Sequence, residues 1–142
     1  MRRTLVVLAL LLGGCVNQLA QRQAFLSQFV GKGPTVLEFW ATWCENCRAL
    51  EPAMKAAQAK YGTRVRFVGV AVSASQSPKR VQLYVQKHAV PWAQVYDTDG
   101  AAVEAYDVPA TSYVVVLDRT GKVVYTGLGG SQDIEGAIKK AM

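Results

Sequence analysis

The 142-residue sequence is poor in the side chains that build metal clusters, since it has one histidine and three cysteines. Charged residues make up 18% of the chain and no run of basic residues is longer than two, so the formal net charge of +6 does not indicate nucleic-acid binding. No apolar run approaches the roughly 20 residues that a transmembrane helix needs. The 51% of hydrophobic residues excludes a disordered chain, and the length suits one domain.

The most continuous apolar run lies at the start of the chain. Two arginines precede Leu5–Leu12, and two glycines and Cys15 follow it. A basic start, a short apolar run and small residues are typical of a secretory signal. The ending Leu12-Gly13-Gly14-Cys15 resembles a bacterial lipobox, which implies cleavage before Cys15 and acylation of its sulfur. The alternative is an ordinary signal peptide in which Cys15 is incidental.

We therefore expect a signal peptide at residues 1–14, a lipid anchor and short tether at 15–18, and a single domain at 19–142. Export would place that domain on the extracytoplasmic side of a membrane, at the periplasmic face or the cell surface. Disulfides form in such oxidising compartments. With Cys15 acylated, two cysteines remain to pair.

Beyond the leader, apolar periodicity predicts alternating helices and strands. Helices are expected at 19–30, 45–61, 77–88, 101–106 and 132–142, and strands at 35–41, 65–72, 91–96, 113–117 and 122–126. The first two strands are continuous apolar runs, as buried parallel strands usually are. The order predicts an α/β fold with a mixed four- to five-stranded central sheet and helices on both faces. Ser131 is the expected N-cap of the last helix.

The chemical signal is the sequence Trp43-Cys44-Glu45-Asn46-Cys47, at the junction of a strand and a helix. Cys44 falls at the helix N-terminus, where free N–H groups favour a thiolate. Cys47 lies one turn further on, near enough to close a disulfide. Two alternatives remain open: half of a zinc site, for which only His88 and Cys15 could add ligands, and a purely structural disulfide. His88 itself is expected at the end of a surface helix.

The stretch Glu38–Arg48 (EFWATWCENCR) resembles the active-site strand and turn of the thioredoxin superfamily, and is most similar to its membrane-tethered TlpA/ResA-like thiol–disulfide oxidoreductases. Pro52 matches the family's helix-kinking proline. The stretch Tyr106–Val124 and the pair Gly129-Gly130 also match. The likeness runs from about Leu19 to the C-terminus and implies a thioredoxin-like fold with no cofactor besides the cysteine pair.

The resemblance also implies a role for each site residue. Cys44 would attack a substrate disulfide, and Cys47 would resolve the mixed disulfide and leave a redox-active 44–47 pair. Glu38 occupies the family's buried acid position, where it could take the proton of Cys47; the alternative is a solvated strand carboxylate. Trp43 would shield the first sulfur and contact substrate.

The family's cis-proline has no obvious counterpart in this chain. An ungapped match places Ser112 at that position, with Thr111 as the preceding residue that pairs with substrate. The competing register uses Pro109 and needs an insertion inside a buried strand. We favour Ser112, and we expect a trans Thr111–Ser112 bond because a non-prolyl cis bond costs about 2.5–4 kcal/mol.

These observations predict a lipid-anchored thiol–disulfide oxidoreductase of the cell envelope, acting as a monomer on protein thiols and disulfides and reduced by an upstream membrane thiol reductase or thioredoxin-like protein. A reductant is expected, because Glu45 places a negative charge beside Cys44 and the motif has no His or Lys. The alternative is a thioredoxin-fold lipoprotein that binds a partner or a metal with little turnover. A third possibility is that the pair is a permanent staple.

Overall fold

The computed structural model describes residues 20, 24, 27, 28 and 32–142 of the chain. The expected signal peptide, Cys15 and most of the helix expected at 19–30 lie outside the described residues. The boundaries expected at 1–14, 15–18 and 19–142 therefore stay predictions.

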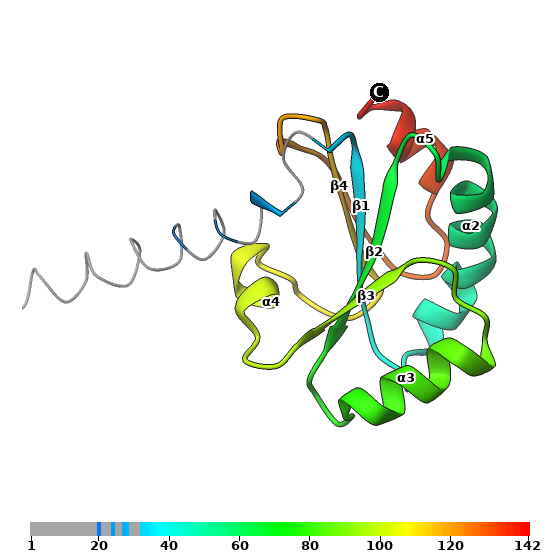
Figure 1. The fold of residues 1–142 in the computed structure, drawn as a ribbon, viewed down its shortest axis with the longest axis vertical. Coiled ribbons are helices and arrows are strands. Elements are labelled where there is room, and N and C mark those ends of the chain that lie inside the picture. The colour runs from blue at the N-terminus through cyan, green and yellow to red at the C-terminus, as the bar shows by residue number, and fades with distance from the viewer. Residues whose placement is uncertain (1–19, 21–23, 25–26, 29–31) are drawn as a thin grey trace, which may run out of the picture.

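A five-stranded mixed sheet forms the centre of the domain (Figure 1), in the order β3-β2-β1-β4-β5. The strands are β1 (Thr35–Trp40), β2 (Arg66–Val72), β3 (Ala93–Asp97), β4 (Tyr113–Leu117) and β5 (Val123–Leu128). The first three are parallel, and β4 and β5 are antiparallel to their neighbours. Because β1 is central, hydrogen-bonded on both sides and fully buried, it reads as an almost unbroken apolar run.

The helices cover both faces of the sheet. They are α2 (Glu45–Tyr61), α3 (Pro78–Lys87), α4 (Ala101–Ala105) and α5 (Ile134–Lys139). In Figure 1, α2, α3 and α5 lie on one side of the strands and α4 lies on the other. The predicted α/β fold with helices on both faces is confirmed, and the sheet has the larger of the two expected numbers of strands.

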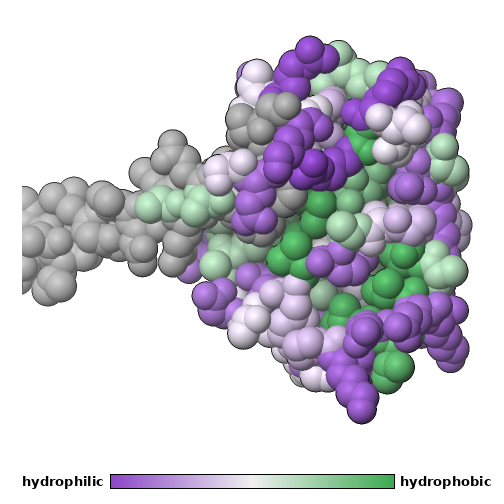
Figure 2. Space-filling model, in the orientation of Figure 1, coloured by the Kyte–Doolittle hydropathy of each residue, from purple (hydrophilic) through white to green (hydrophobic). Residues whose placement is uncertain are grey.

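Strand alternation divides the core between these two faces. Val36 packs in the cluster under α2 and α5, whereas Leu37 and Phe39 pack in the cluster under α4. Glu38 lies between Leu37 and Phe39 in the sequence, so its side chain points to the opposite face of the sheet. It therefore shares the α2 face with Val36 and Trp40. Seen from outside in the same view, hydrophilic residues dominate the two ends of the domain and hydrophobic residues gather over its middle (Figure 2).

The last helix differs from the sequence-based expectation. It spans Ile134–Lys139 rather than 132–142, and its N-cap is Asp133 rather than Ser131. The Asp133 carboxylate accepts a hydrogen bond from the Gly136 backbone N–H at 2.9 Å. Both residue types are good caps, so propensity did not separate them; the preceding loop decides where the first helical turn begins.

Candidate active site

The two cysteines lie where the central strand passes into α2. Cys44 is the N-cap of α2, and the Cys47 backbone N–H donates to Cys44 Sγ at 3.1 Å. The two residues form a disulfide with a Cα–Cα distance of 5.3 Å, and both are buried. The predicted pairing and its position at a helix N-terminus are therefore present in the structure.

Glu38 is a buried acid on the face of the sheet that carries α2. It is 5% exposed and lies between Gly69 of β2 and Val114 of β4. Burial, and to a smaller extent the negative charge of Glu51, raises the pKa of Glu38 to about 8. A carboxyl group with this pKa can hold or release a proton near neutral pH, in the range where thiols titrate. The alternative of a solvated strand carboxylate is wrong.

Glu38 and Cys47 line the same small cavity, together with Glu51 and Tyr84. Its volume is about 10 Å³, near the roughly 10–15 Å³ that one water molecule needs. The buried acid and the second cysteine therefore border a common space of about the size of one water molecule. Cys44 does not line this cavity.

Gly69 makes room for one wall of this cavity. A Cβ at Gly69 would collide with the amide group of Gln94, so a larger residue would displace that side chain from its place across β2. Gln94 in turn accepts a hydrogen bond from Trp40 Nε1 at 2.8 Å. Trp40 is 5% exposed and thus closes the core beside the site.

Trp43 lies at the surface beside the disulfide. It is 42% exposed, and its Nε1 donates to the Ala74 carbonyl at 2.9 Å, which fixes the ring against the loop after β2. A largely apolar cavity of about 320 Å³ opens next to it, lined also by Val103, Val108 and Thr111. Trp43 and Thr111, two of the residues expected to contact substrate, therefore face a common space.

Ser112 is buried at the entry to β4, whereas Pro109 is exposed. The Ser112 N–H donates to the Phe39 carbonyl at 2.8 Å, its Oγ donates to the Gly129 carbonyl at 3.1 Å, and its φ is +63°. The Thr111–Ser112 bond is trans, like every peptide bond of the described residues. This placement supports the register that uses Ser112.

The glycine pair after β5 lets a loop approach the first turn of α2. A Cβ at Gly130 would lie 2.8 Å from the Ala49 Cβ and 3.1 Å from the Asn46 carbonyl oxygen. Gly129 has a φ of +104°, a conformation that side chains rarely adopt. The two glycines therefore let the loop pack against Asn46 and Ala49 in the first turns of α2.

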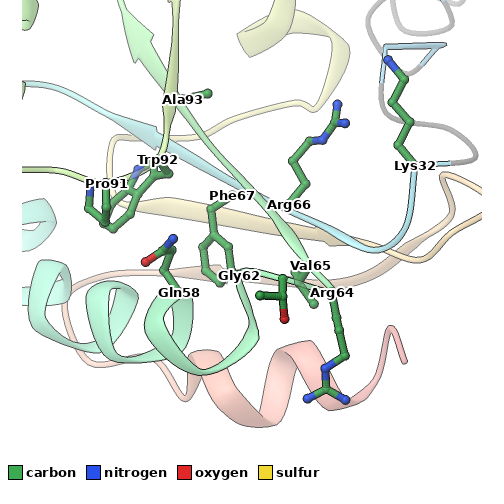
Figure 3. Close-up of a pocket in the computed structure, with 11 residues that line it drawn as sticks. Lys32, Gln58, Gly62, Arg64, Val65, Arg66, Phe67, Pro91, Trp92 and Ala93 are labelled. Atoms are coloured by element: carbon green, nitrogen blue, oxygen red, sulfur yellow. The ribbon is translucent and has the colours of Figure 1, made fainter.

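A second open cavity, of about 340 Å³, lies near the amino ends of β2 and β3. Figure 3 shows Phe67 and Trp92 on its wall and the charged groups of Lys32 and Arg64 pointing in opposite directions. Arg64 lies over the Tyr61 ring, and Arg66 donates to the Gln28 carbonyl at 3.2 Å. The basic side chains thus do not converge on a common ligand.

Two residues of the site were not found from the sequence. Glu51 and Tyr84 both line the cavity of Glu38, and the Tyr84 hydroxyl donates to Glu51 Oε2 at 3.1 Å. The spacing of four between Cys47 and Glu51 places both on one helix face and could have pointed to Glu51. Nothing local could have pointed to Tyr84, because α3 joins the site only through the tertiary fold.

Within the described part of the chain, no helix combines the length and hydropathy needed to cross a membrane. Over the same residues, no group of three or more His, Cys, Asp or Glu side chains is placed to hold a metal ion.

Residues 17–141 match the family described as Redoxin. The chain belongs to the Redoxin family. "Thiol-disulfide oxidoreductase ResA" of Bacillus subtilis (strain 168) is 36% identical to this Redoxin over 99 residues, which cover 70% of the chain and 54% of ResA. The chain thus spans about half the length of that relative.

Solved structures agree with this membership. A putative thiol:disulfide interchange protein DsbE from Chlorobium tepidum is 26% identical, with a TM-score of 0.70 over 82% of this Redoxin and 81% of that chain. A secreted Mycobacterium tuberculosis disulfide oxidoreductase homologous to E. coli DsbE is also 26% identical, with a TM-score of 0.67 over 81% and 84% of the two chains. The expected thioredoxin-like fold is confirmed.

Proposed function

We propose that this Redoxin is an exported, lipid-anchored thiol–disulfide oxidoreductase that reduces protein disulfides in the cell envelope. The observation that carries the proposal is the Cys44–Cys47 pair at the N-terminus of α2, with the buried carboxyl group of Glu38 in the same cavity as Cys47. The similarity to ResA, which is named a thiol-disulfide oxidoreductase, supports the same reaction class.

The first step is carried out by Cys44. In the reduced protein the N-terminus of α2 favours the Cys44 thiolate. This sulfur attacks one sulfur of the substrate disulfide and forms a mixed disulfide, while the substrate S–S bond breaks. The released substrate sulfur leaves as a thiolate and takes up a proton.

Cys47 completes the cycle. The Glu38 carboxylate accepts the proton of the Cys47 thiol, and the resulting thiolate attacks Cys44 Sγ. The 44–47 disulfide forms, the mixed disulfide breaks, and the second substrate sulfur leaves as a thiolate. Two electrons have then passed from the cysteine pair to the substrate, and an upstream dithiol donor restores the reduced pair.

Substrate binding is assigned to the surface beside Cys44. The exposed ring of Trp43 and the apolar cavity that it shares with Thr111 suit an extended peptide segment. The backbone of Thr111 would pair with that segment, and Ser112 would hold Thr111 in place through its bonds to Phe39 and Gly129.

The direction of electron flow is assigned from the charge beside the nucleophile. Glu45 is the acidic residue in the first turn of α2 and opposes the helix dipole that would stabilise the Cys44 thiolate. A less stabilised thiolate makes the dithiol a better reductant. A redox titration should therefore give a potential well below that of the strongest oxidants, and a value near about −120 mV would contradict the assignment.

Insulin reduction with dithiothreitol tests the reaction itself. We expect turnover by the purified protein and its loss in Cys44→Ser. The Cys47→Ser variant should accumulate a mixed disulfide, and mass spectrometry of the captured partner identifies the substrate. An inactive protein that binds stoichiometric metal would instead support the binding-module hypothesis, and thiols that never titrate would support the structural staple.

A further inference from the structure

The cavity beneath the cysteine pair also holds a second carboxylate. Glu51 lies four residues after Cys47 on α2 and lines the same cavity as Glu38 and Tyr84. Its side chain is 16% exposed, whereas Glu38 is 5% exposed. Glu51 is therefore the acidic group that touches both the enclosed cavity and solvent.

Basic and polar side chains surround the Glu51 carboxyl group. Lys55 Nζ lies 2.8 Å from Oε1, the Tyr84 hydroxyl donates to Oε2 at 3.1 Å, and His88 Nδ1 lies 3.6 Å from Oε2. The ring of His88 stacks on Tyr84 with centroids 3.8 Å apart. Two further charged side chains, Glu38 and Arg48, interact electrostatically with this group of residues around Glu51.

The two carboxyl groups therefore differ in environment although they share one cavity. Burial and the charge of Glu51 raise the pKa of Glu38, while a lysine, a hydroxyl and an imidazole surround Glu51. Paired acids with such different surroundings suit proton transfer between a buried group and an accessible one.

Such transfer is needed in the proposed cycle. The proton that Glu38 takes from Cys47 has to reach solvent or the departing substrate thiolate, and Glu38 itself is only 5% exposed. Glu51, by contrast, contacts partly exposed groups, since the side chains of Lys55 and His88 are 36% and 32% exposed.

We propose that Glu51 is the relay through which Glu38 exchanges its proton with solvent, with His88 and Tyr84 at the outer end of the route. The proton leaves the Cys47 thiol for Glu38, passes to Glu51 directly or through one water molecule, and is released at the side of α3. No electron moves in these steps, and each carboxyl group returns to its starting state. This inference rests on the proposed function.

The test measures the resolving step separately from the attack by Cys44. Reduced protein is mixed rapidly with insulin, and closure of the 44–47 disulfide is followed by quenching and mass spectrometry between pH 6 and pH 9.5. In Glu51→Gln we expect closure at pH 7 to slow by roughly 10- to 100-fold, because assisted proton transfer contributes factors of that order or more. Alkylation of Cys44 by iodoacetamide should keep its wild-type rate.

The pH profile distinguishes a relay from a structural role. The defect should disappear above about pH 9, where a thiol ionises without a base, and Glu51→Asp should recover much of the rate at pH 7. Glu135→Gln removes a carboxylate that pairs with Lys60 and does not line the cavity, and it serves as the matched control.

Wild-type closure rates in Glu51→Gln across the whole pH range would overturn the relay while leaving the oxidoreductase intact. A slowing that is equal at every pH would also overturn it, because that result indicates a structural effect. Absence of disulfide reduction by the wild-type protein would instead remove the proposed function and the relay with it.

Discussion

Glu38 shows how one residue links burial, protonation and stability. Its carboxyl group sits in the central strand, where water cannot solvate the charged form. In the folded protein it keeps its proton until about pH 8, whereas in the unfolded chain it loses the proton near its ordinary pKa of 4.5. The site therefore carries an acid that is costly to ionise.

Replacing Glu38 with Gln should change the pH dependence of stability. Between pH 4.5 and pH 8 the unfolded chain binds fewer protons at this residue than the folded protein, so the wild-type free energy of unfolding falls as pH rises. Each pH unit between the two pKa values is worth about 1.4 kcal/mol, and we expect a loss of about 4 kcal/mol across this window that Glu38→Gln lacks. Urea denaturation at several pH values measures the difference. Equal slopes in the two proteins would show that Glu38 ionises in the folded state as in water.

Ser112 holds a backbone conformation that the family's proline could not adopt. Its φ is +63°, while the proline ring fixes φ near −65° and removes the N–H that donates to Phe39. We therefore expect Ser112→Pro to lower the free energy of unfolding by about 3 kcal/mol or more. Ser112→Gly keeps the N–H and accepts the positive φ, so its change should stay within about 1 kcal/mol. Chemical denaturation compares them, and similar stability of the two variants would contradict this account.

At the scale of elements, the site depends on the contact between α2 and the loop that leads from β5 to α5. Gly130 approaches the first turn of α2 so closely that any side chain would meet Ala49 and the Asn46 carbonyl. The same loop supplies the Gly129 carbonyl that accepts from Ser112. A displacement of this loop would therefore reach both the helix that carries the cysteines and the residue before β4.

Gly130→Ala should destabilise the protein by about 1–3 kcal/mol, the usual cost of overpacking a close contact. The double variant Gly130→Ala/Ala49→Gly should recover part of that loss, because it removes the Cβ that lies 2.8 Å away. Gly129→Ala serves as the control: its cost comes from a φ of +104° and nothing lies near its Cβ position, so Ala49→Gly should not rescue it. A double-mutant cycle by urea denaturation gives the coupling, and equal rescue of both variants would contradict the steric explanation.

At the scale of the whole molecule, the sheet order brings distant segments together. With β1 in the centre, Glu38 lies between β2 and β4, the cysteines follow the end of β1, and Thr111 and Ser112 directly precede β4. The loop after β2 holds Trp43 through Ala74, and the Gln76 side chain accepts from the Thr42 N–H at 2.9 Å. Several crossovers are therefore needed before the site is complete.

The attachment of the molecule to a membrane is a prediction at this scale. We expect protein expressed in a bacterial host to begin at Cys15 and to carry a diacyl or triacyl group there, because the sequence before it resembles a lipobox. Two or more acyl chains would give stable anchoring. Intact-mass measurement and N-terminal peptide mapping detect the modification, with Cys15→Ser as the control. Cleavage at another bond with an unmodified Cys15 would contradict the prediction.

The sequence by itself determined the parts of this protein that depend on local pattern. Periodicity placed the strands to within a few residues, and the cysteine spacing placed a disulfide at the first turn of α2, because both features are set by neighbours along the chain. Glu38 could be assigned to the interior because it interrupts an apolar strand. The choice of Asp133 rather than Ser131 as the N-cap of α5 was instead decided by the loop that leads into this helix.

Only the tertiary structure decided what surrounds the buried acid. Glu51 faces Glu38 across a cavity whose walls come from β1, α2, α3, β3 and the segments beside them, and Tyr84 reaches Glu51 over 33 positions of sequence. The positive φ of Ser112 likewise follows from bonds to Phe39 and Gly129, which lie in other strands or loops. Local pattern encodes which face a side chain takes, but the groups that meet on that face are fixed by how the strands and helices pack.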